Sequence, residues 1–206
     1  MKKFAIIILA IIIVAALASC GQKADGGADA NASARDPADM KPETMHFATA
    51  AVTISLPDDW EMVPDEGTPV PFTVQTYNLE LLPPSGTKAL GIVTVGKIEG
   101  GEQLSAEDFF ILVSTRIEML LPEAVEDEAD FKPIEVRDGD GVYCILTDAS
   151  LVGRAIPPNE YAYVAVFFAN YKNGCLTYAS LLTDDPDSES FATMLNAVAG
   201  IETTFD

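Results

Sequence analysis

The sequence predicts an α+β fold with a central antiparallel sheet of about six to seven strands and helices packed on its faces. One observation is a series of short β-type segments joined by tight-turn sequences such as Asn173-Gly174, which connect antiparallel neighbours. The other is a pair of segments with helical periodicity that do not alternate with the strands, which is typical of α+β rather than α/β folds.

Three strands are expected in the first half of the folded part. They cover residues 51–56, 72–82 and 89–98. The first alternates between apolar and polar residues and is closed by Pro57. Asp58-Asp59 then predict a turn, after which the chain runs back from Trp60. The third is nearly continuously apolar, which is the pattern of a strand buried on both faces.

A helix is expected after Gly100-Gly101. Ser105 fits its N-cap position, and Asp108 three residues later completes an approximate capping box. Pro122 is expected to end the helix, because proline removes a backbone donor and clashes with the preceding turn. Apolar side chains recur at helical spacing on one face, at Phe109, Val113, Ile117, Leu120 and Leu121.

Four strands and a second helix follow. Residues 131–137 and 142–149 predict a hairpin around Asp138-Gly139-Asp140-Gly141. Residues 161–171 are the most apolar segment, so we expect that strand at the centre of the sheet, joined by a tight primed turn to residues 175–183. The last helix begins near Asp187 or Ser188 and ends near Gly200, with an apolar stripe of Phe191, Met194, Leu195, Val198 and Ile201.

The first twenty residues have the pattern of an export signal. Lys2 and Lys3 precede an apolar run at residues 4–18, which is shorter than the roughly 20 residues that span a membrane. Leu17-Ala18-Ser19-Cys20 then resembles the lipobox of bacterial lipoproteins. The resemblance implies cleavage between Ser19 and Cys20 and a covalent diacylglyceryl group on Cys20. The alternatives are an uncleaved anchor or an export signal with an incidental cysteine.

Composition divides the rest of the chain into a tether and one domain. Residues 20–46 contain no Val, Ile, Leu, Phe, Tyr or Trp, so they cannot bury enough apolar surface to offset the entropy of ordering. We expect a flexible tether there, with a reach of about 30 Å. Residues 47–206 are expected to form a single α+β domain, and residues 1–19 the lipoprotein signal peptide.

The domain resembles the PsbP-like family, which includes the Mog-type proteins and many small bacterial lipoproteins. The resemblance rests on Ser55-Leu56-Pro57 followed by Trp60, the helix at 105–121, the antiparallel strands within 142–183, and a C-terminal helix after Asp184-Asp185-Pro186-Asp187. It implies a central antiparallel sheet with helices on both faces and a non-catalytic assembly or interaction role. It transfers no binding residues to this chain.

Charge and histidine content argue against two classes of function. The chain has 12 basic and 32 acidic residues and a net charge of -20, so it repels phosphate backbones and nucleic-acid binding is not expected. Its single histidine, His46, falls in the expected tether, where no rigid scaffold would orient it for catalysis. We therefore assign no catalytic residues and no metal ligands.

Two cysteines remain in the expected domain. Cys144 and Cys175 lie in strands separated by the strand at 161–171. Strands once removed are about 9.6 Å apart, whereas disulfides need Cα atoms within about 7 Å. We expect two buried free thiols.

Acidic clusters are the main candidate for ligand binding. They comprise Glu123, Glu126, Asp127, Glu128 and Asp130 in one loop, Asp184, Asp185, Asp187 and Glu189 in another, and Asp138 and Asp140 in a hairpin. Oxygen-rich loops can bind Ca²⁺, but none of these has EF-hand spacing, and acids also stabilise helix N-termini. A solvated acidic face is the main interpretation.

Aromatic residues gather on two neighbouring strands, at Tyr161, Tyr163, Phe167, Phe168, Tyr171 and Tyr178. Core packing explains most of them, and an uncovered sheet face would make them an apolar binding surface.

The sequence thus predicts a lipoprotein anchored through Cys20 to the extracytoplasmic face of the cell membrane. Gly21 follows Cys20, so the resemblance to lipoproteins gives no signal for inner-membrane retention, and the outer membrane is the expected site if the cell has one. The expected role is non-catalytic binding of an envelope protein or small ligand, with no cofactor besides the covalent lipid. The alternatives are a Ca²⁺-dependent binding module and, less favoured, a carboxylate-dependent hydrolase.

Overall fold

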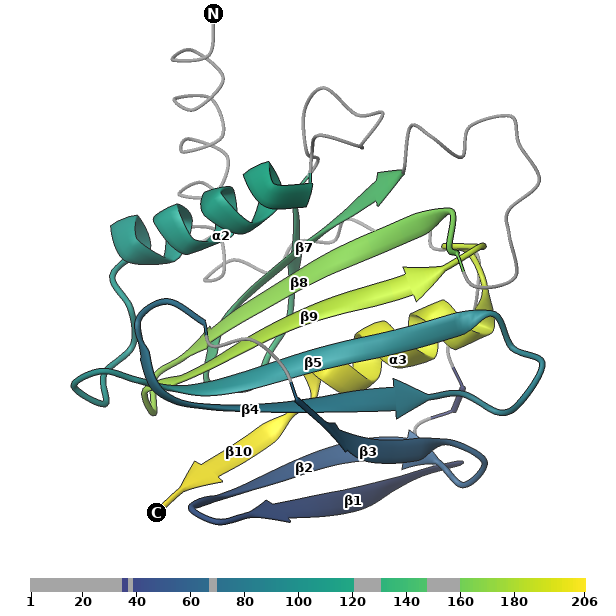
Figure 1. Cartoon of the computed structure of the whole chain (residues 1–206), viewed down its shortest axis with the longest axis horizontal. Coiled ribbons are helices and arrows are strands. Elements are labelled where there is room, and N and C mark those ends of the chain that lie inside the picture. Colours follow the sequence, from purple (N-terminus) through teal and green to yellow (C-terminus); the bar gives the residue numbers. More distant parts are fainter. Residues whose placement is uncertain (1–34, 37–38, 67–69, 121–130, 148–159) are drawn as a thin grey trace, which may run out of the picture.

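The computed structural model describes residues 35–36, 39–66, 70–120, 131–147 and 160–206, and these form a mixed α+β arrangement of two sheets and two helices (Figure 1). The α+β class expected from the sequence is therefore confirmed. The expected signal peptide and lipobox, Pro122 and the acidic loop within 121–130 lie outside the described residues. Neither described helix is long and apolar enough to cross a membrane.

The larger sheet has seven strands in the order β3-β4-β5-β9-β8-β7-β6, and every neighbouring pair is antiparallel. The strands are β3 (Glu61–Asp65), β4 (Thr73–Leu82), β5 (Ala89–Ile98), β6 (Lys132–Ile134), β7 (Gly139–Thr147), β8 (Tyr163–Tyr171) and β9 (Cys175–Thr183). The consecutive pairing of β7, β8 and β9 confirms the late antiparallel strands expected from the sequence.

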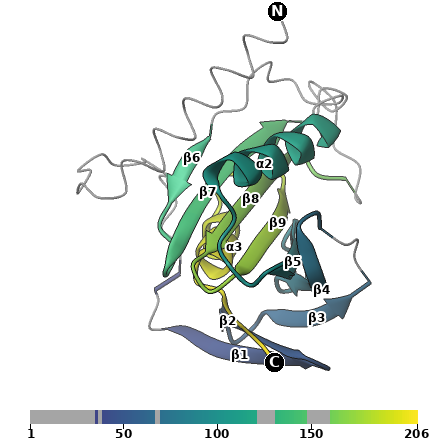
Figure 2. The same cartoon turned by 90° about the vertical axis from the view of Figure 1, so that its left-hand side faces the viewer.

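A smaller sheet has the order β1-β2-β10. It consists of β1 (Met40–Phe47), β2 (Ala50–Pro57) and β10 (Glu202–Phe205). This sheet and α3 (Glu189–Ala199) pack against one face of the larger sheet, whereas α2 (Ala106–Leu120) packs against the other face (Figure 2). Helices therefore cover both faces of the central sheet.

Alternating side chains on β8 build two separate cores. Phe167 belongs to the core shared with β2 and α3, where Met194 of α3 is also fully buried. Phe168, the next residue, belongs to the core under α2, beside Phe109. Because successive strand residues point to opposite faces, β8 is apolar at nearly every position and buried on both sides.

Serine caps position both helices. Ser105 Oγ accepts a hydrogen bond from the Asp108 N–H (3.1 Å) and donates one to Asp108 Oδ2 (2.7 Å). Ser188 Oγ accepts from the Phe191 N–H (3.2 Å) at the start of α3, and Gly200 is the C-cap of that helix. Both expected helix starts are confirmed, since each cap satisfies a backbone donor that has no partner within the helix.

The expected boundary between tether and domain at residue 47 is wrong, because β1 begins at Met40. Eight residue pairs join β1 to β2 through the backbone, and backbone pairing does not require apolar side chains. On β1 only Met40, Met45 and Phe47 are partly buried, and the other five side chains are exposed. The amino-acid composition of this strand therefore resembles that of a linker. His46 is an exposed residue of this strand, opposite Ala51, rather than part of a linker.

The set of strands that form the central sheet, and their order, also differ from the expectation. The opening strand β2 belongs to the smaller sheet, and the short strand β3, which the sequence pattern did not predict, forms one edge of the larger sheet. The middle of the seven strands is β9, while β8 lies next to it. Strand order depends on long-range pairing, which local hydrophobic pattern does not encode.

The turns differ in detail from the expected ones. Three residues, Lys172 to Gly174, connect β8 to β9, and among them only Gly174 has a positive φ (76°). A two-residue primed turn needs a positive φ at Asn173 as well, so this is the longer hairpin loop with a left-handed glycine. A Cβ at position 174 would lie 2.3 Å from the Gly101 carbonyl oxygen, so close packing also requires glycine there. In the earlier hairpin, β7 begins at Gly139 and the turn precedes it.

We expect Phe167→Ala to lower the free energy of unfolding by about 3–5 kcal/mol, because it removes a ring that is fully buried in the core. Urea unfolding followed through the fluorescence of the buried Trp60 measures this change. Val74→Ala is the control, since Val74 is 59% exposed and the expected change is within about 0.5 kcal/mol. Equal losses in the two variants would contradict the burial of β8.

Candidate functional site

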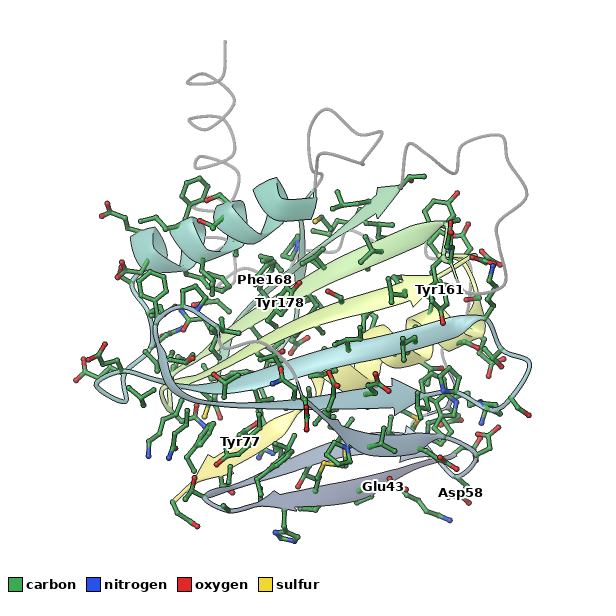
Figure 3. All side chains as sticks on the ribbon, in the orientation of Figure 1. Glu43, Asp58, Tyr77, Tyr161, Phe168 and Tyr178 are labelled. Carbon is green, nitrogen blue, oxygen red and sulfur yellow. The ribbon has the colours of Figure 1, made fainter. Side chains whose placement is uncertain are left out.

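A charged groove lies where the N-terminal end of the described chain meets the β2–β3 turn and the start of α3. Its volume is about 560 Å³, and it is lined by Arg35, Asp36, Asp39, Lys41, Asp58, Asp59 and Glu189. Asp58 lies at one end of the smaller sheet, near the lower right of Figure 3. Five of the seven lining side chains are carboxylates, so the groove is electrostatically suited to a cationic group on a partner.

Arg35 ties the N-terminal segment to the domain at this groove. Its two terminal nitrogens donate to the two carboxylate oxygens of Asp59, at 2.6 and 3.1 Å, and its Nε donates to Glu189 Oε1 at 3.1 Å. The Arg35 N–H also donates to Thr193 Oγ1, on the buried side of α3, at 3.4 Å. The paired, planar guanidinium–carboxylate geometry fixes orientation as well as distance.

The ion pairs shift the protonation equilibria of the groove. The hydrogen bond from Arg35 lowers the pKa of Asp59, with burial opposing it, and the hydrogen bond to Asp59 raises the pKa of Arg35. The Asp59 carboxylate therefore stays ionised to lower pH than an ordinary aspartate. Its contribution to holding Arg35 is complete above the ordinary aspartate pKa and is lost as pH falls through the lowered value.

These ion pairs are accessible to a competing ligand. Lys41 Nζ lies 2.6 Å from Asp58 Oδ2, with the two side chains 69% and 67% exposed. Exposed pairs of this kind contribute little to stability and are screened by salt. A charged partner can therefore replace them at small cost, which suits a docking surface better than a structural cluster.

A second polar region lies between the two sheets, under β10. Register places Gln75, Lys97 and Cys175 side by side on β4, β5 and β9. Cys175 Sγ donates to the Thr203 carbonyl oxygen at 3.8 Å, and Lys97 Nζ donates to the Asp206 main-chain oxygen at 3.1 Å. The end of β10 is thus held against the larger sheet by polar groups.

Burial keeps the Cys175 thiol and the Tyr171 phenol of this region protonated. It raises the pKa of the Cys175 thiol, and the hydrogen bond from Asn173 and the nearby Lys97 charge oppose the shift only in part. Burial also raises the pKa of Tyr171 to about 12. A thiol whose pKa is raised is a poor nucleophile at neutral pH, so this region does not have the chemistry of a cysteine active site.

Three aromatic rings join the smaller sheet to the larger one. Phe47 stacks on Tyr77 with centroids 4.4 Å apart, and Tyr77 stacks on Phe205 at 6.3 Å. Tyr77, on the larger sheet, is labelled in Figure 3, and its hydroxyl is hydrogen-bonded to that of Thr49 at 2.7 Å. Sequence reasoning singled out none of these three rings, since they come from segments far apart in the chain.

The aromatic residues singled out on the two late strands do not form one surface. Phe167 and Phe168 are fully buried in different cores. Tyr178 packs against Phe168, with ring centroids 5.1 Å apart, in the space under α2 (Figure 3). Core packing is therefore the main role of this group, as expected.

The acidic loop before α3 has local structural roles. Asp184 accepts a hydrogen bond from the Ala162 N–H (3.1 Å) and forms an ion pair with Lys88 (2.6 Å). Asp185 Oδ1 accepts from the Asp187 N–H (2.9 Å), and Glu189 pairs with Arg35. In the earlier hairpin, Asp140 accepts from Gln103 (2.8 Å) and Asp138 has a positive φ of 55°. Among the described residues, no group of three or more His, Cys, Asp or Glu is arranged to bind a metal ion.

The two cysteines of the domain lie in different cores. Cys144 is buried with Phe168 under α2, whereas Cys175 belongs to the core on the other face, with β8 between their strands. Both are free and buried, as the strand order predicts. A bridge between them would require the sheet to come apart.

No protein-family model matches the chain, and no curated protein matches its sequence. The groove and the polar region under β10 are therefore interpreted from their own residues.

We expect the pKa of Asp59 to lie below the ordinary aspartate value and to rise towards it in Arg35→Gln, because that substitution removes the charged donor. Carboxyl-carbon NMR during a pH titration measures the shift. Lys41→Gln is the matched control in the same groove, and it leaves the pKa of Asp59 unchanged because Lys41 pairs with Asp58. Equal effects of the two substitutions would show that the pKa of Asp59 depends only on the total charge of the groove.

Proposed function

We propose that this protein is a bacterial lipoprotein anchored through Cys20 on the extracytoplasmic face of the cell membrane, where its domain binds an envelope protein or small ligand without catalysis. The lipobox-like Leu17-Ala18-Ser19-Cys20, behind a basic start and an apolar run, supports the anchor. The charged groove of about 560 Å³ supports the binding role, and it is the observation on which the function depends.

The position of the groove favours a role near the membrane. Arg35 contacts the domain at the groove, so only residues 20–34 separate it from the proposed lipid. A free chain of that length has a reach of about 20 Å, against about 30 Å for the tether expected from composition. The groove would then face partners close to the membrane surface.

The PsbP-like resemblance fits this proposal. The antiparallel central sheet with helices on both faces is the arrangement that the resemblance implies. The opening strand β2, which carries the Ser55-Leu56-Pro57 of the resemblance, departs from this arrangement, because it lies in the smaller sheet with β1 and β10. Because one fold can have many functions, the binding role rests on the groove rather than on the resemblance.

Three observations favour binding over catalysis or Ca²⁺ binding. The buried Cys175 is kept protonated, and His46 is exposed on the edge strand β1. The carboxylates of the loop before α3 are engaged with Lys88, Arg35 and backbone N–H groups. Asp184 and Asp185 are thereby engaged within the fold, and Glu189 contributes to the charged groove rather than to a metal site.

We expect Cys20→Ala to abolish incorporation of labelled palmitate, because Cys20 is the proposed acceptor. The variant should also leave the membrane fraction that contains lipid-modified proteins. Cys144→Ala is the control and retains the label, since Cys144 is a buried core residue. A labelled Cys20→Ala protein would contradict the lipobox. In the unfolded, unreduced wild type we expect two free thiols, from Cys144 and Cys175, whereas three would show that Cys20 carries no lipid.

We expect a photoreactive residue at Asp39, in the groove, to cross-link one recurrent partner in intact cells, whereas the same residue at the exposed Val74 does not. Asp58→Lys in the Asp39 cross-linking variant should reduce the yield at least severalfold, because it reverses one groove charge. Mass spectrometry of the cross-linked species measures both. Equal cross-linking yields from Asp39 and Val74 would contradict a role for the groove. A yield from Asp39 that Asp58→Lys leaves unchanged would contradict it as well.

A further inference from the structure

The charged groove already contains a guanidinium group, that of Arg35. Its Nη1 and Nη2 donate to the two carboxylate oxygens of Asp59, at 2.6 and 3.1 Å, and its Nε donates to Glu189 Oε1 at 3.1 Å. All three nitrogens of the planar fork are therefore bonded to two carboxylates at once. A lysine ammonium is a point charge and cannot match this pattern of parallel and lateral bonds.

The two carboxylates are held by the fold, whereas the guanidinium comes from outside it. Asp59 lies in the β2–β3 turn, which is closed by a hydrogen bond from the N–H of the buried Trp60 to the Pro57 carbonyl oxygen (3.0 Å). Glu189 is the first residue of α3, in its capped first turn. Arg35 precedes β1 and belongs to no helix or strand. The fold thus supplies a preformed receptor for a guanidinium, and Arg35 is the part that can leave.

The contacts of Arg35 are open to exchange. The side chains of Arg35, Asp59 and Glu189 are 34%, 46% and 58% exposed, so an incoming group reaches them from solvent. The main-chain bond from the Arg35 N–H to Thr193 Oγ1 is long, at 3.4 Å. Exposed ion pairs contribute little to stability. A guanidinium on another molecule can therefore replace that of Arg35 one for one, with neither carboxylate left unpaired.

We propose that Arg35 is an internal competitor for the groove: it occupies a guanidinium subsite formed by Asp59 and Glu189, and an arginine side chain of the envelope partner replaces it on docking. This inference rests on the proposed function, and it names the chemistry of the partner and the regulation of its binding. The partner is a protein with an arginine on its exposed surface.

The internal competitor affects both affinity and specificity. An occupant in the same chain is present at high effective concentration, and it lowers the apparent affinity of a partner in proportion to the fraction of molecules in which the groove is filled. A partner must also reproduce the contacts that it displaces. Arg35 therefore selects against basic surfaces that carry only lysine, because these leave part of the Asp59 and Glu189 geometry unmatched.

Removal of Arg35 should strengthen the binding of an arginine peptide. The probe is a capped six-residue peptide of alternating arginine and glycine, titrated calorimetrically into the full chain purified in detergent from expressing cells. We expect Arg35→Gln to bind it about threefold or more tightly than the wild type. Lys41→Gln is the matched control, because it removes the same charge from the same groove without opening the guanidinium subsite, and its gain should be clearly smaller. Equal gains in the two variants would overturn the proposal.

A peptide of alternating lysine and glycine tests the preference for a guanidinium. We expect it to bind Arg35→Gln about threefold or more weakly than the arginine peptide does. Adding Glu189→Gln should reduce this difference, because the carboxylate that accepts from Nε is lost. Equal affinities of the two peptides for Arg35→Gln would overturn the proposal, and so would an arginine peptide that does not bind this variant.

Cross-linking in intact cells separates this proposal from the proposed function. In the Asp39 cross-linking variant, Arg35→Gln should raise the yield of the partner about threefold, because the partner no longer competes with Arg35. A partner captured from Asp39 but not from Val74, with a yield that Arg35→Gln leaves unchanged or lowers, would overturn the internal competitor and leave the binding role of the groove intact. Equal yields from Asp39 and Val74 would instead overturn both.

Discussion

The rest of the structure depends on the burial of β8 on both of its faces. Phe167 and Phe168 are adjacent and fully buried, yet they point into different cores because strand residues alternate. Each face of the central sheet must therefore be covered. α2 covers one face, and α3 with the smaller sheet covers the other, so the two helices and the three extra strands all satisfy the same requirement.

This arrangement determines where polar groups can lie. The smaller sheet closes on the central sheet through apolar residues of β2 and through the stack of Phe47, Tyr77 and Phe205. At the end of that interface, β10 is short and the facing side chains become polar, with Lys97, Cys175 and Tyr171 in one row. Burial at that end favours the protonated thiol and phenol. The region holds β10 against the larger sheet and is not a reactive site.

The charged groove is on the outside of the same assembly. It forms because the start of α3, the β2–β3 turn and the segment at Arg35 meet at one end of the smaller sheet. In a chain with a net charge of -20, a guanidinium between two carboxylates both holds the segment and leaves an acidic surface around it. The proposed lipid anchor and the proposed docking surface would then be joined by a short tether.

The sequence by itself determined the elements that depend on local chemistry. Ser105 and Ser188 fixed the helix starts, and the apolar runs located β4, β5, β8 and β9. The expected strand between those of Cys144 and Cys175 indicated two free thiols. Only the tertiary structure decided that Met40–Phe47 is a strand, that β2 leaves the central sheet, and that Arg35 meets Asp59 and Glu189. The physical reason is range: caps and periodicity act within a few residues, whereas backbone pairing and ion pairs join residues distant in the chain, and a polar edge strand resembles a linker until its partner is known.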